Sequence, residues 1–209
     1  MTPPIPINLA VEDILSEAVL RKILRESKKD FAVGACFCHG GYAYLKKSIR
    51  GFNNAAKAAP FLVLTDLDKA ECPPVLLREW LPHPRHPNLL FRIAVREVEA
   101  WLLAHREALA KFLGIQRQLI PYEVDNLADP KQLLISLARK SKKRQLREAI
   151  VPRSGSTAKV GPDYNGQLAL FVEHFWEIAK AAQNSPSLQR TVRAITDFNP
   201  RFANQKISF

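Results

Sequence analysis

The first half of the chain alternates between short apolar segments and segments with helical periodicity, and this alternation restricts the fold more than any other feature. The apolar segments predict strands at residues 5–12, 30–38, 61–66 and 88–95. The segments that follow them predict helices within residues 14–27, 40–59, 73–81 and 96–113. Parallel strands need long crossovers, usually helices, so this order predicts an α/β fold with a mainly parallel sheet flanked by helices.

The last third of the chain contains no convincing strand and predicts helices only. The helical segments are residues 129–150, 164–183 and 185–198, and Ser185 and Pro186 suit the N-cap and first turn of the last one. We therefore expect an α/β core at residues 1–115. A helical C-terminal region, residues 116–209, is expected to pack on that core as part of one structural unit.

Composition limits the class of protein and the kind of partner. The 209 residues are 47% hydrophobic and 24% charged, which is typical of a globular chain, and no apolar run is long enough for a membrane span. The N-terminus lacks the features of a secretory signal, and three cysteines favour a reducing cytoplasm over a disulfide framework. The 31 basic residues exceed the 20 acidic ones, and a net charge of +11 favours nucleic acid as a partner.

Acidic residues follow three of the four predicted strands. They are Glu12, Asp66, Asp68, Glu97 and Glu99. Ligand sites in open α/β sheets form at the carboxyl ends of the strands, so we expect these carboxylates to converge. Several carboxylates in one place need a cation, and oxygen ligands suit Mg²⁺ or Mn²⁺. The alternative is that each acid caps a helix or lies in a solvated loop.

These acids, in their sequence context, resemble the TOPRIM domain of topoisomerases, DnaG-type primases and OLD-family nucleases. The segments "VEDILSEAVL", "LVLTDLD" and "AVREVEAWLLA" carry the resemblance, with "GGYAYLKKSI", "AKVGPDYN" and "SPSLQRTVRAI" in support. They are most similar to a bacterial TOPRIM-like family of unknown function that is often found beside ATPase genes. Many TOPRIM proteins have glycine after the first glutamate, whereas this chain has Asp13.

The resemblance implies roles for particular acids. Asp66 and Asp68 would bind a divalent metal, and Glu12 would be a metal ligand or a general acid or base. Glu99 best matches the next acid of the family, and Glu97 is the second choice. The implied fold is a TOPRIM-like sheet, and the implied chemistry is metal-dependent cleavage of a phosphodiester bond.

Basic residues in two kinds of segment are candidates for phosphate binding. Lys159 lies in a loop rich in Gly, Ser and Pro, where it could stabilise charge on a pentavalent phosphate, or simply be solvated. The segment "RKSKKRQLR", expected on a helix with Leu146 as its anchor, and the segment "GGYAYLKK" supply the other candidates. These are Lys46, Lys47, Arg139, Lys140, Lys142, Lys143 and Arg144.

Two hypotheses from different functional classes remain. The first is a nuclease that uses Mg²⁺ or Mn²⁺, with Glu12, Asp66, Asp68, Glu99 and Lys159 as catalytic residues. The resemblance adds a setting for it: a cytoplasmic prokaryotic effector in phage defence that works with an ATPase. The second is a non-catalytic TOPRIM-like subunit that binds an ATPase or a nucleic-acid complex.

Overall fold

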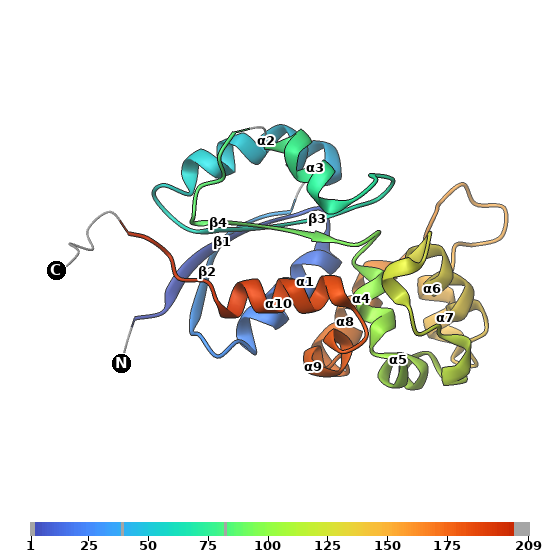
Figure 1. The fold of residues 1–209 in the computed structure, drawn as a ribbon. Helices are drawn as coiled ribbons and strands as arrows, with labels where there is room; N and C mark the ends of the chain where they lie inside the picture. The colour runs from blue at the N-terminus through green and yellow to red at the C-terminus, as the bar shows by residue number, and fades with distance from the viewer. Residues whose placement is uncertain (1–2, 39, 82, 203–209) are drawn as a thin grey trace.

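The computed structural model describes residues 3–38, 40–81 and 83–202. Its strands are β1 (Ile5–Val11), β2 (Phe31–Phe37), β3 (Phe61–Asp66) and β4 (Leu89–Ala94). They form one sheet in the order β2-β1-β3-β4, and every neighbouring pair is parallel (Figure 1). The predicted fold class, a parallel sheet flanked by helices with a helical C-terminal part, is therefore confirmed.

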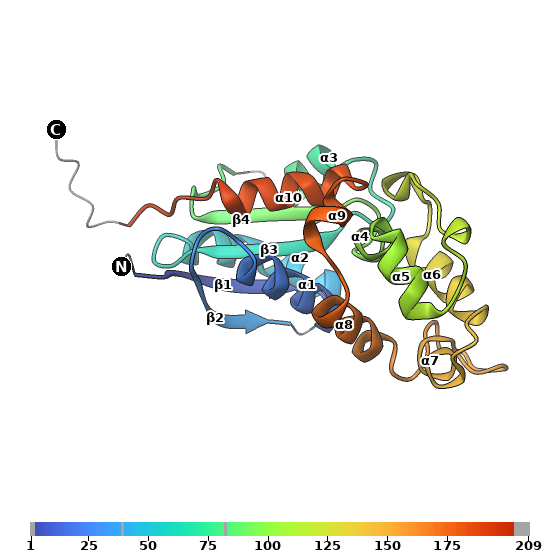
Figure 2. The same ribbon diagram turned by 90° about the horizontal axis from the view of Figure 1, so that it is seen from below.

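Helices cover both faces of the sheet, as the pattern predicted. On one face lie α2 (Gly41–Ala55) and α3 (Pro73–Trp80), and on the other lie α1 (Ile14–Arg25) and α10 (Pro186–Thr196) (Figures 1 and 2). The interior strand β3 consequently has every residue buried, whereas the edge strand β2 is partly exposed. Glu12 lies just beyond the end of β1, whereas the sequence had predicted it to be the last residue of that strand.

The remaining helices gather beyond the carboxyl end of the sheet and beside α1 (Figures 1 and 2). They are α4 (Glu99–Ala104), α5 (Arg106–Leu113), α6 (Pro130–Arg139), α7 (Arg144–Ile150), α8 (Tyr164–His174) and α9 (Ile178–Ala182), with short 3₁₀ turns at Arg117–Leu119 and Val124–Asn126. One continuous hydrophobic cluster joins the inner face of the sheet to these helices, with Trp101 and Trp176 both fully buried in it. The predicted core positions of these two tryptophans are confirmed.

Three of the predicted helices are each divided into two, so their predicted continuity is wrong. The segment 96–113 divides at His105, whose Nδ1 accepts a hydrogen bond of 3.0 Å from the backbone N–H of Glu177. The segment 164–183 divides where Trp176 is buried and donates its indole N–H to the carbonyl of Trp101 at 3.0 Å. In both places the break serves contacts between segments more than seventy residues apart.

The basic segment is divided in the same way, between Arg139 and Arg144. Ser141 is buried in the connection and donates its hydroxyl to the carbonyl of Leu113 at 2.5 Å. The prediction of a single basic helix is therefore wrong, although Leu146 is buried as predicted. The predicted start of the last helix is confirmed, since Ser185 is its N-cap and accepts a hydrogen bond from the backbone N–H of Leu188.

In the part of the chain that the structure describes, no helix has the length and apolar character needed to cross a lipid bilayer.

Candidate functional site

Glu12 connects the ends of the two central strands. Its Oε1 accepts hydrogen bonds from the hydroxyl of Thr65 at 2.5 Å and from the backbone N–H of Asp66 at 2.8 Å. Burial raises the pKa of Glu12, and these two hydrogen bonds offset part of that effect. The carboxylate is therefore held firmly at the carboxyl edge of the sheet, where the sequence predicted it.

Asp66 is the last residue of β3, and its side chain is turned inward. The residue is only 9% exposed, and its Oδ1 accepts a 3.0 Å hydrogen bond from the backbone N–H of Val98, just before α4. Burial raises the pKa of Asp66 well above its usual range, and repulsion from Glu99 and then Glu12 adds to the shift. Glu12 and Glu99 thus both lie close enough to Asp66 for their charges to raise its pKa, and we call the three residues, of which Glu12 is partly exposed, the buried acids.

Glu99, the first residue of α4, is the most deeply buried of these acids, at 1% exposed. Its Oε1 accepts a hydrogen bond of 2.9 Å from the hydroxyl of Tyr164, the first residue of α8. Its Oε2 is buried and has no hydrogen-bond partner among the described residues. Burial raises the pKa of Glu99 to about 7, although the positive charge of Lys131 opposes the shift. One carboxylate oxygen is therefore free to bind a cation or a proton.

Among the residues that the structure describes, Lys131 is the cation that pairs with Glu97 and Glu99. Its Nζ lies 3.5 Å from Oε1 of Glu97 and 3.5 Å from Oε1 of Glu99. Its backbone N–H donates to Oε2 of Glu97 at 2.8 Å, so Glu97 contacts the lysine at two points. Burial works against the charge of Lys131, but the carboxylates around it, Glu99 foremost, raise its pKa above the usual value.

Sequence reasoning missed Lys131 and Tyr164. A signal for Lys131 was present, because "DPKQ" begins a helix with Asp129 as its N-cap and thus places a lysine in the first turn. The positive end of the helix dipole disfavours lysine there, so such a lysine calls for an acidic partner. Tyr164 lies within a segment that carries the TOPRIM resemblance, but nothing in the sequence assigned it a role.

Asp68 and Glu97, unlike the buried acids, line an open cleft of about 740 Å³. The exposed Asp68 has a positive φ of 48°, and Arg96, with a φ of 61°, donates its guanidinium to the backbone carbonyl of Asp68 at 2.9 Å. Non-glycine residues with positive φ are uncommon, and they often mark functional loops. The two aspartates of "DLD" therefore face different surroundings: Asp66 is interior and Asp68 borders the cleft.

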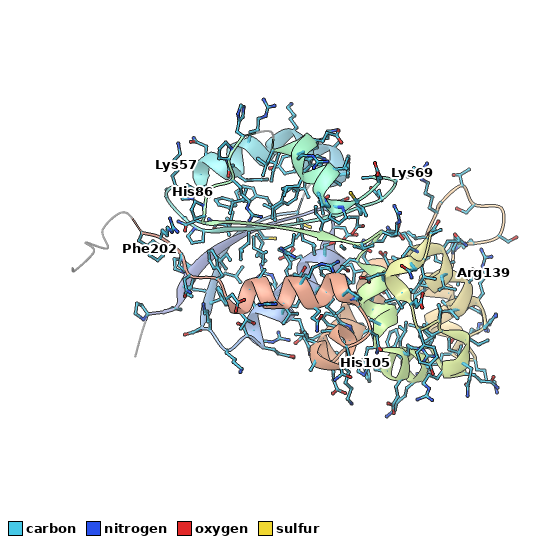
Figure 3. All side chains as sticks on the ribbon, viewed as in Figure 1. Lys57, Lys69, His86, His105, Arg139 and Phe202 are labelled. Carbon is cyan, nitrogen blue, oxygen red and sulfur yellow. The ribbon has the colours of Figure 1, made fainter. Side chains whose placement is uncertain are left out.

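The other walls of the cleft carry cationic side chains. They come from the loop after β3, from α6 and from the loop before α8: Lys69, Lys131, Arg139, Arg153 and Lys159. Figure 3 shows Lys69 and Arg139 at the end of the molecule where the C-terminal helices gather, and Lys57 and His86 at the opposite end. The structure thus brings the predicted Lys159 and Arg139 to the same cleft as Asp68 and Glu97.

The other predicted phosphate-binding residues do not line this cleft. Lys46 pairs with Glu79 at 2.5 Å and Arg144 with Glu148 at 2.8 Å, while Lys143 donates to the carbonyls of Lys111 and Phe112. Lys47, Lys140 and Lys142 are exposed. These side chains either have partners within the chain or lie on open surface.

The carboxylates suit an oxygen-bound divalent ion in kind and in charge. The Oε2 of Glu99 has no hydrogen-bond partner among the described residues, and burial raises the pKa values of Asp66 and Glu12, so a nearby positive charge would stabilise their ionised forms. Within residues 3–38, 40–81 and 83–202, however, no three Asp, Glu, His or Cys side chains are arranged as ligands of one ion. Binding an ion would therefore require some of these side chains to turn toward it.

Comparison of the chain with protein-family models, with curated proteins and with solved structures gave no match.

Proposed function

We propose that the protein hydrolyses phosphodiester bonds of DNA or RNA with Mg²⁺ or Mn²⁺ as its cofactor. The observation that carries this proposal is that the buried acids converge beside a cleft lined by cationic side chains. A metal-dependent phosphodiesterase needs both features: carboxylates to hold the ion, and positive charge to draw in a polyanion. The net charge of +11 and the resemblance to TOPRIM proteins support the same function.

The buried acids Glu12, Asp66 and Glu99 would hold the ion, with Asp68 and Glu97 available from the cleft side. A bound Mg²⁺ or Mn²⁺ makes water a better nucleophile and offsets negative charge on the phosphate. Glu12 is well suited to a fixed position in such a site, because Thr65 and the backbone of Asp66 both hold its Oε1.

The cationic residues of the cleft would bind and orient the phosphate. Arg139 at the end of α6 and Arg153 and Lys159 in the loop before α8 line the same cleft as Asp68. Their charges would draw the nucleic-acid backbone toward the acids.

A cleavage assay on single- and double-stranded DNA and RNA tests the proposal. We expect cleavage with Mn²⁺ or Mg²⁺, none with EDTA, and none by the variant Asp66→Asn with either ion. The variant Asp197→Asn is a matched control, because Asp197 is an exposed aspartate at the end of α10 that pairs with Arg193. Cleavage by Asp66→Asn at the wild-type rate would rule out the proposed site.

A second candidate is a metal-free module that binds a phosphate-bearing partner without cleaving it. The ammonium group of Lys131 favours this alternative, because it already supplies positive charge to Glu97 and Glu99. Calorimetric titration with Mn²⁺ separates the two candidates. Heat of binding at millimolar Mn²⁺ that is lost in Asp66→Asn supports the enzyme, whereas its absence supports the binding module.

A further inference from the structure

The contacts of Lys131 point to a role beyond pairing with one acid. Its ammonium lies at equal distances, 3.5 Å, from a cleft-side carboxylate, Glu97, and from a buried one, Glu99. The same lysine also lines the cleft in which a phosphate would bind. It therefore lies at the boundary between the acids and the space for the substrate.

Without those carboxylates, a lysine at position 131 would cost free energy of folding. It is the second residue of α6, where the positive end of the helix dipole repels a cation, and its side chain is only 32% exposed. The backbone N–H of Lys131 is bound by the same Glu97 whose other oxygen faces the ammonium. The lysine and the acids are thus built as one unit, in which each offsets the cost of burying the other.

We propose that Lys131 is the resident cation of this carboxylate cluster and that it competes with a divalent ion for it. Without an ion, the lysine keeps Glu97 and Glu99 together. When an ion binds, the two positive charges repel each other, and the ammonium turns into the cleft, where it is placed to contact the phosphate. This inference rests on the proposed function and adds to it a built-in limit on metal affinity.

The test compares the wild type with Lys131→Met, which keeps most of the length of the unbranched side chain and removes its charge. Calorimetry with Mn²⁺ should show the variant binding the ion about tenfold more tightly or better, because a nearby positive charge has been removed. Thermal unfolding in EDTA should show the variant melting below the wild type, and Mn²⁺ should raise its melting temperature by more.

Two further variants make the result specific. Lys131→Arg keeps the positive charge and should retain the Mn²⁺ affinity of the wild type. Lys57→Met removes an exposed lysine at the opposite end of the molecule (Figure 3) and should leave the affinity unchanged, which excludes an effect of net charge.

The outcome for Lys131 can be told apart from the outcome for the enzyme. Unchanged Mn²⁺ affinity in Lys131→Met, including no uptake by either protein, overturns the inference, even if wild-type protein cleaves nucleic acid. Tighter Mn²⁺ binding by Lys131→Met supports the inference, even if wild-type protein cleaves nothing and the proposed function fails.

Discussion

The sheet has two contrasting environments: the face beneath α2 and α3, and the carboxyl edge. The face is filled by aromatic side chains, in which Phe52 stacks on Phe61 with ring centroids 5.4 Å apart and Trp80 on Phe91 at 5.5 Å. The edge instead buries the carboxylates of Asp66 and Glu99. Burial of apolar rings favours folding, whereas burial of acids costs free energy unless it is compensated. The aromatic face therefore stabilises the fold, whereas the buried carboxylates at the edge destabilise it.

The largest effect on stability should come from the aromatic face. Trp80 is 2% exposed, and Trp80→Ala leaves a cavity beneath α3, so we expect a loss of roughly 3–5 kcal/mol in the free energy of unfolding. Urea denaturation measures it. Metal affinity per folded molecule should be unchanged, because the carboxylates are not touched.

Trp80→Phe is the control for this substitution. The indole N–H of Trp80 is buried without a hydrogen-bond partner among the described residues, so little is lost with it, and we expect a cost below about 1.5 kcal/mol. A cost from Trp80→Ala as small as this would mean that the aromatic face does not supply the stability.

The next effect concerns pH and the carboxyl edge. The pKa of Glu99 is about 7 in the folded protein and ordinarily 4.5, so between these values the folded state keeps a proton that the unfolded chain releases. Stability from this group is therefore fully present below about pH 4.5 and falls as the pH rises toward 7. The fall attributable to Glu99 should be roughly 3 kcal/mol, since the pKa differs by about 2.5 between the two states and each pKa unit corresponds to about 1.4 kcal/mol.

Glu99→Gln cannot titrate, so its metal-free stability should fall less than that of the wild type between about pH 5 and pH 8. Urea denaturation in EDTA across this range measures the difference. The matched control is Glu107→Gln, an exposed glutamate on α5, which should follow the wild-type curve. Parallel curves for wild type and Glu99→Gln would show that Glu99 is not the group that responds to pH.

A smaller effect on stability should come from the hydrogen bond that holds Glu12 in place. Thr65→Val keeps the shape of a buried side chain but removes the hydroxyl that donates to Glu12, and we expect a loss of about 1–2 kcal/mol. Thr65→Ser retains the hydroxyl and should recover the hydrogen bond, at the cost of one methyl group. If Thr65→Val equals the wild type in stability and in Mn²⁺ affinity, Glu12 does not depend on this bond.

The same contrast explains how far the sequence could be interpreted. The sheet and its flanking helices were predictable, because residues 61–64 form a continuous apolar run and the helices have apolar faces. The approach of Glu12 to Asp66 was predictable too, because parallel strands end at a common edge. These features depend on local pattern and on one rule of topology.

Features that depend on distant contacts were not predictable. At the break between α4 and α5, the Nδ1 of His105 accepts a hydrogen bond from the backbone N–H of Glu177, and no local sequence pattern predicts this contact. Lys131 and Tyr164 reach Glu99 from segments 32 and 65 residues further along the chain, so even the local signal that Lys131 needs an acidic partner could not name that partner. The predicted single helix for the basic segment failed for the same reason, since the hydrogen bond from Ser141 to Leu113 fixes the turn.

The smallest effect on stability, and the most informative for function, lies at the exposed cleft. The double variant Arg139→Gln/Lys159→Gln removes two cations whose side chains line the cleft, and unfolding free energy should change by less than about 0.5 kcal/mol. If both cations bind phosphates, affinity should weaken for all sequences. The slope of log affinity against log salt for duplex DNA should fall by nearly two, since each phosphate that is no longer neutralised lowers it by roughly 0.9.

Asp68→Asn should act in the opposite direction. The carboxylate of Asp68 lines the same cleft, so it repels a phosphate, and losing its charge should leave binding unchanged or tighter while cleavage is lost. Filter binding over a salt series, with a cleavage assay on the same proteins, measures both. The pair Lys46→Gln/Lys47→Gln is the control, because these exposed lysines of α2 do not line the cleft. A reduced salt slope in this control, with an unchanged slope in the cleft variant, would place the nucleic-acid surface on α2 and leave the cleft without a substrate.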